Sequence, residues 1–264
     1  MIRRTTLIAL AALPALMHSL GAQSLETRVR AVGDGSAQFR FAARPGVCGD
    51  GHSYIAAGRT TFMGSSINFG RNNDWRAGCV PGPVRVVLSV HDGAVDNLRA
   101  YVGPDARGAD AVTDLGTVSD RDASAYLLGL AARGQGRVGE RSILPAVLAD
   151  SSTPWPALFA IARDSSARPR PTRDAAFFWL SRAASAAVNK TDIFADTNDE
   201  DDESDVANSA VFALSQLRHK EGIDPLIEVA RTNKNPRVRS HALFWLGQSR
   251  EAKALALFQD LITR

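Results

Sequence analysis

The stretch HALFWLGQSR, residues 241–250, decides the fold. Its apolar residues form an unbroken run from Ala242 to Leu246, and the run stops at Gly247. A helix on the surface of a globular protein needs only one apolar stripe. The unbroken run therefore predicts a helix that is buried on most of its circumference.

The same phrase occurs twice more, in RDAAFFWLSRA (173–183) and NSAVFALSQLR (208–218). Each copy holds an alanine, then a phenylalanine, then a leucine that is followed by a small residue. The aligned sets are Ala176, Ala210 and Ala242; Phe178, Phe212 and Phe244; Leu180, Leu214 and Leu246; and Ser181, Ser215 and Gly247. The copies follow one another at steps of 34 and 32 residues.

A second phrase recurs with the first, because LFAIARD (158–164) aligns with LIEVART (226–232) two periods later. Two helices in a period of roughly 30–40 residues are typical of an α-solenoid. A solenoid helix packs against its partner and against the equivalent helices of neighbouring repeats, which explains the apolar run. The small residue after the shared leucine allows two helices to cross closely.

The sequence VRSHALFWLGQSREAKALALFQDLI (238–262) resembles the short HEAT repeats of bacterial proteins, also called PBS-lyase HEAT-like repeats. The resemblance rests on an arginine-rich start, an Ala-Leu-x-x-Leu-Gly core and a second helix with Ala-Leu spacing. It is clear for 172–264, weaker for 119–171 and absent from 25–118. It implies a curved stack of helix pairs that binds a partner, usually a protein, and it carries over no catalytic residue.

The composition is that of an ordinary globular protein, with 45% apolar and 22% charged residues in 264. The formal charge of +3 falls by two if Arg3 and Arg4 are removed with the N-terminal segment. Lysine and arginine form no cluster along the chain. A nucleic-acid partner or an anionic membrane surface is therefore not expected.

The N-terminus has the three parts of an export signal. MIRR is basic, TLIALAALPALM is a short apolar segment, and HSLGAQS offers small residues for cleavage near Gly21 or Ala22. Residues 1–22 are therefore expected to be a signal peptide, and the mature protein to be periplasmic or extracellular, with the general and twin-arginine routes both open. No other stretch is apolar and long enough for an integral membrane segment.

Cys48 and Cys79 are the two cysteines of the chain. In an oxidising compartment they are expected to form a disulfide. A metal site that uses Cys48 with His52 and His91 is the alternative, although the spacing matches no common zinc pattern.

Residues 25–118 have strand-like alternation and are expected to form a β region stapled by the disulfide. One hairpin is predicted from RVRAV (28–32) and AQFRFA (37–42), and a second from VRVVLSV (84–90) and AVDNLRAYV (94–102). Residues 45–83 are predicted to be a long loop with one strand near TTFM. From Ser119 the period becomes helical. The expected fold class is α+β: a small N-terminal antiparallel β region, then a HEAT-like α-solenoid over 119–264.

Three motifs suggest chemistry, and each has a simpler explanation. Residues 134–139 fit the G-x-G-x-x-G dinucleotide pattern, but the preceding segment has a helix start rather than a strand, which favours a helix–helix connection. The acidic stretch 196–205 lacks the glycine of an EF-hand and favours a solvated loop, with calcium binding or a basic partner left open. His52, Asp50 and Asp92 would form a hydrolytic cluster only if their loops converge.

The helical part offers candidate partner-binding residues. Trp155 begins a helix in TPWP, and Glu228 and Arg231 lie on a second helix of a repeat. Trp179 and Trp245 occupy equivalent repeat positions and are expected to be core. The last helix, 252–264, is strongly apolar where solenoids usually end in a polar cap, so we expect it to be covered by another subunit, a partner or its own repeats.

These observations predict an exported, non-enzymatic protein–protein interaction module without a cofactor or metal, whose protein partner is not identified. The alternative is a ligand-binding protein or a hydrolytic enzyme that uses the N-terminal β region. A third possibility is a metal-responsive adaptor that uses the acidic stretch.

Overall fold

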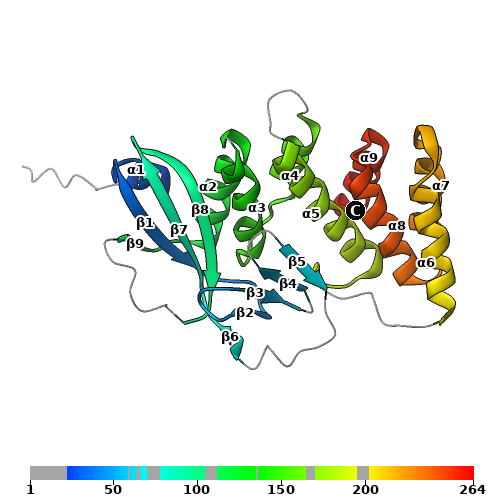
Figure 1. The fold of residues 1–264 in the computed structure, drawn as a ribbon, viewed down its shortest axis with the longest axis horizontal. Coiled ribbons are helices and arrows are strands. Elements are labelled where there is room, and N and C mark those ends of the chain that lie inside the picture. Colours follow the sequence, from blue (N-terminus) through cyan, green and yellow to red (C-terminus); the bar gives the residue numbers. More distant parts are fainter. Residues whose placement is uncertain are drawn as a thin grey trace, which may run out of the picture.

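A computed structural model describes residues 23–58, 60–63, 66–69, 78–104, 112–134, 136–164, 170–194 and 202–264. Within these ranges a β region precedes a helical stack, so the expected α+β class is confirmed (Figure 1). The expected signal peptide, residues 1–22, lies outside them. None of the helices in the described part is long and apolar enough to cross a membrane.

Two sheets form the β region. The four-stranded sheet has the order β8-β7-β1-β9, with β1 (Gly35–Phe41), β7 (Val84–His91), β8 (Ala94–Val102) and β9 (Val112–Thr117). The five-stranded sheet has the order β5-β4-β3-β2-β6, with β2 (Val47–Gly49), β3 (Ile55–Ala57), β4 (Thr60–Met63), β5 (Ser66–Phe69) and β6 (Val80–Pro81). Neighbouring strands are antiparallel except β1 and β9, which are parallel.

The second predicted hairpin is confirmed by the pairing of β7 with β8, but the first is wrong. Residues Leu25–Arg30 form the helix α1, and β1 pairs with β7 and β9 instead. The Ser24 hydroxyl accepts the backbone N–H of Thr27 at the helix start, and Leu25 and Val29 are buried one turn apart. Over only five residues, the apolar pattern of such a short amphipathic helix looks like the alternation of a strand.

The predicted strand near TTFM is confirmed as β4, but the long loop predicted for the rest of 45–83 is wrong, because the whole second sheet lies there. Its strands have two to four residues, too few to produce a visible alternation. Cys48 on β2 and Cys79 next to β6 lie at disulfide-bond distance, with Cα atoms 5.3 Å apart. Their covalent link joins the two strands at one edge of this sheet.

Eight helices follow in the described residues after the β region. They are α2 (Asp120–Arg133), α3 (Arg137–Leu148), α4 (Trp155–Arg163), α5 (Arg170–Asn189), α6 (Asp202–Ser215), α7 (Ile223–Thr232), α8 (Pro236–Ser249) and α9 (Ala252–Thr263). The Ser119 hydroxyl caps α2, as its start signal predicts, and Asn235 caps α8, whose first residue is Pro236.

The helices do not stack in the order of the chain. Figure 1 shows α8 and α9 between the pair α4 and α5 and the pair α6 and α7. Asn189 of α5 donates to the Ser240 hydroxyl of α8 at 2.7 Å. On the other side of α8, the rings of Phe212 on α6 and Trp245 are 5.2 Å apart. The last pair of the chain is therefore an inner layer of the stack.

This order explains the apolar C-terminal helix. Phe258 of α9 is fully buried, and Lys253 of the same helix forms an ion pair with Asp224 of α7 at 2.8 Å. The outer position belongs to α6, where Phe212 is 47% exposed although its repeat equivalents are half-buried. Of the three coverings expected for α9, the structure shows packing by the protein's own repeats.

The small residue after the shared leucine has the role that the repeat phrase suggests. Gly247 of α8 faces Ser181 of α5, its repeat equivalent, where the two helices cross. A Cβ atom at Gly247 would lie 2.8 Å from the Ser181 Cβ and 3.3 Å from the Phe177 carbonyl oxygen. These distances leave no room for a side chain unless a helix moves.

We predict that Phe258→Ala will lower the free energy of unfolding by about 3–5 kcal/mol, because it leaves a cavity inside the stack. Phe212→Ala, the matched control at the outer helix, should cost less than about 1 kcal/mol because that ring is already half in water. Chemical denaturation monitored by circular dichroism measures both. Equal costs would show that α9 is not an inner layer.

We also predict that Gly247→Ala will destabilise the protein, although alanine is favoured over glycine inside a helix by about 1 kcal/mol. The added Cβ must push α5 and α8 apart. Gly129→Ala in α2 is the control, since a Cβ there meets only the flexible end of Arg133. Melting temperatures should fall for the first variant and stay level or rise for the second. A stabilised Gly247→Ala protein would contradict the close crossing.

Candidate binding cleft

A cleft of about 740 Å³ lies between the β region and the helices. Its walls are the hairpin of β3 and β4, strand β8, and helices α3 and α5, and the C-terminal end of α8 closes one side. The volume lies within the range of roughly 300–1,000 Å³ that is usual for ligand sites.

Aromatic side chains join the two regions at the base of the cleft. The ring of Trp179 on α5 lies 5.7 Å from that of Phe62 on β4 and 5.2 Å from that of Phe178. Phe62 and Trp179 are each 4% exposed, so Trp179 is core as expected. Phe178 is half-buried and offers an apolar surface to the cleft.

A buried arginine fixes the sheet side of the cleft. The guanidinium of Arg85 on β7 lies 4.7 Å from the centre of the Tyr101 ring on β8 and donates to the Gly51 carbonyl oxygen at 3.0 Å. The cation over the ring and the hydrogen bond to the loop hold Tyr101, which lines the cleft, in one position.

Arginines dominate the charged lining. Arg141 on α3 donates to the Asn97 side-chain oxygen of β8 at 2.6 Å. Arg99 on β8 and Arg137 on α3 are exposed, and neither has a hydrogen-bond or ion-pair partner among the described residues. Arg250 at the end of α8 is bound to the carboxylate of Asp174 on α5.

The turn after β2 brings His52 to the rim of the cleft. The Asp50 carboxylate accepts the backbone N–H groups of His52, Ser53 and Tyr54, at 3.0, 2.8 and 3.1 Å, and the Ser53 hydroxyl. Partial burial alone would raise the pKa of Asp50, but these hydrogen bonds outweigh it and hold the pKa well below the usual range for an aspartate.

The hydrolytic cluster suggested by the sequence does not form. Arg85, near the start of β7, donates a hydrogen bond to Gly51, so the neighbouring His52 lies near the start of that strand. His91 is the last residue of the same strand. His91 lies six positions after Arg85 along the strand, a distance of about 20 Å. His91 and Asp92 therefore lie far from the cleft, and the same separation removes His91 from the cysteines.

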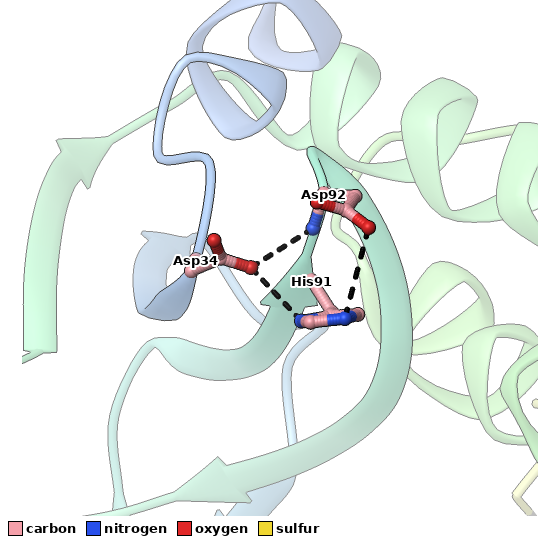
Figure 2. Close-up of side chains that lie close together, drawn as sticks. All are labelled: Asp34, His91 and Asp92. Carbon is pink, nitrogen blue, oxygen red and sulfur yellow. Dashed lines mark hydrogen bonds and ion pairs between the residues drawn. The ribbon is translucent and has the colours of Figure 1, made fainter.

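His91 and Asp92 instead meet Asp34, as Figure 2 shows. The Asp34 carboxylate accepts the Asp92 backbone N–H at 3.0 Å and lies 2.9 Å from the His91 Nδ1 atom. One donor atom of each residue lies within 4.8 Å of the others, a set that could bind a cation, but all three side chains are exposed. These contacts fasten the end of β7 and the turn that follows it to the residue before β1.

The three predicted partner-binding residues lie on two helices and outside the cleft. Trp155 begins α4 and is half-buried against the core. Glu228 and Arg231 are exposed on α7, and Arg231 lies 3.5 Å from Asp260 of α9. None of the three lines the cleft. Their role in binding stays a prediction.

The remaining motifs carry no site in the described residues. Gly134 and Gly136 end α2 and precede α3, so the glycine motif is a helix–helix connection, and Gln135 lies outside the described residues. Gly139 packs against Thr172 of α5. Residues 196–201 of the acidic stretch lie outside the described residues, and only the backbone of the following four is described, at the start of α6.

The stack of paired helices and the repeat phrase agree with the comparison against known families. Residues 194–264 match the family model described as HEAT repeats. The matched residues include α6 to α9 and make up about a quarter of the chain. No match was found among curated proteins or among solved structures.

The cleft arginines were missed in the sequence because no motif joins them. Arg99 lies on a strand and Arg137 and Arg141 on a helix nearly forty residues later. The single signal is the four-residue spacing of Arg137 and Arg141, which places them on one helix face.

Asp50 yields a prediction on pH dependence. Because folding lowers its pKa, its contribution to stability is present above the usual value of 3.8 and is lost as the pH falls below it. Asp50→Asn should therefore lower stability by about 1 kcal/mol at neutral pH, since neutral acceptors form weaker hydrogen bonds. The difference from wild type should shrink between about pH 5 and about pH 2.

Urea denaturation over this pH series makes the measurement. Asp96→Asn is the control, because Asp96 is exposed and has no hydrogen-bond partner in the described ranges. A difference between Asp50→Asn and wild type that does not change with pH would contradict the role of the carboxylate.

Proposed function

We propose that the protein is an exported, non-enzymatic scaffold that binds a protein partner in the cleft, with residues 25–118 and 119–264 each forming one side. The observation that carries the proposal is the cleft itself, which has unpartnered arginines and half-buried apolar side chains on walls from both halves. The HEAT repeats support a role in protein interaction, since stacked helix pairs form extended binding surfaces.

Export is part of the proposal. The N-terminal sequence and the cysteine pair at disulfide-bond distance both support an oxidising compartment outside the cytoplasm. We further propose that the repeats belong to the short bacterial type with PBS-lyase-like spacing, because Ala242, Leu243, Leu246 and Gly247 follow that phrase.

The alternative of a hydrolytic enzyme loses its main support in the structure, because His52 lies apart from His91 and Asp92. A ligand-binding protein remains the second candidate, favoured by the cleft volume. The scaffold would hold a segment of a protein in the cleft, whereas the ligand-binding protein would hold a small molecule there.

The experiment places the photo-reactive residue benzoylphenylalanine at Gln248, which is exposed at the cleft, or at Ala256, which is exposed on α9 outside it. After irradiation in the native exported fraction, one recurrent protein should be captured at position 248 and not at 256. Ala175→Trp, which fills the cleft, should abolish this capture while the far-ultraviolet circular dichroism spectrum is retained. Equal capture at both positions, or capture that survives Ala175→Trp, would contradict the proposal.

A further inference from the structure

The cleft carries an excess of positive charge. Its lining includes the four arginines 99, 137, 141 and 250, against the two carboxylates of Glu140 and Asp174. Asp174 is already bound by Arg250 and lies 3.8 Å from the guanidinium of Arg170. The guanidinium groups of Arg99, Arg137 and Arg141 therefore outnumber the one remaining carboxylate of the lining, that of Glu140.

These three groups come from two walls that face the same space. Arg137 and Arg141 are one turn apart on α3. Arg99 lies on β8, two residues from Asn97, whose side-chain oxygen holds Arg141. Arg141 uses one N–H group in this bond, so most donors of the set are available to an occupant.

The chemistry of the set selects carboxylates. A guanidinium group donates two parallel N–H bonds to one carboxylate, which gives both direction and strength. Arg99 and Arg137 are exposed, however, and a single ion pair at an exposed position contributes little. Useful affinity therefore requires an occupant that brings several carboxylates at once.

Apolar surface beside the arginines adds a second requirement. Leu144 on α3, Phe178 on α5 and Tyr101 on β8 are half-buried and line the cleft. An apolar side chain of the occupant can cover them and remove water from the ion pairs next to them.

The length of the cleft indicates an extended occupant. Its lining runs from Arg137 to Pro145 on α3 and from Pro171 to Trp179 on α5. Each of these spans is about 12 Å of helix. Roughly four residues of extended chain cover the same distance.

Building on the proposed function, we infer that the cleft binds an acidic, extended segment of the protein partner. Carboxylates of the segment pair with Arg99, Arg137 and Arg141, and an apolar side chain between them contacts Phe178 and Leu144. Glu140 repels a carboxylate at its own position, and this repulsion helps to set the register of the segment.

The test measures the fluorescence anisotropy of a labelled peptide that contains several glutamates around one phenylalanine. We expect binding to the mature full chain that weakens with added salt, and at least tenfold weaker binding of the peptide with glutamine in place of glutamate. The variant Arg99→Ala/Arg137→Ala should also raise Kd at least tenfold. Arg121→Ala/Arg218→Ala, which removes the same charge outside the cleft, should change Kd less than twofold.

Equal effects of the two double variants would overturn the inference, because the attraction would then be a property of the whole surface. Competition by free glutamate at the same carboxylate concentration would also overturn it and would identify a small-anion site. If cross-linking at Gln248 captures a partner that the acidic peptide does not displace, the proposed function stands and the acidic segment is wrong. If neither capture nor peptide binding occurs, both are wrong.

Discussion

The close crossing of α5 and α8 is the constraint on which the rest of the structure depends. Gly247 meets Ser181 there, and no other residue type than glycine leaves the α5 backbone in place. The crossing fixes α8 against α5, and α8 in turn supports α6 and α7. It also brings Arg250 to Asp174, so the same contact positions one end of the cleft.

The helix α5 also connects the stack to the β region. Trp179 of α5 packs against Phe62 of the second sheet. Phe178, the residue before Trp179, lines the cleft. Because both walls of the cleft are attached to this one helix, their spacing is set by core packing rather than by flexible loops. A surface of this kind binds with little loss of conformational freedom.

Much of the helical part could be predicted from the sequence, because burial on several sides leaves a repeated apolar phrase with fixed spacing. The order of the helices could not, since the positions of Phe212 and Phe258 in the stack depend on contacts between distant repeats. In the second sheet the strands are too short for a period to show, whereas the longer strands β7 and β8 were predicted; α1 spans too few residues to be told from a strand. The cleft arginines meet only in three dimensions, so no local pattern marks them.

The inner position of α8 and α9 has a consequence for how the chain reaches its native state. In an ordinary solenoid each repeat docks on the one before it, and structure can grow along the chain. Here α8 and α9 lie next to α5, while α6 and α7, which precede them in the chain, pack mainly on α8. The place of α6 and α7 therefore depends on α8, and the contacts between α5 and α8 join segments about fifty residues apart, a topology that slows folding.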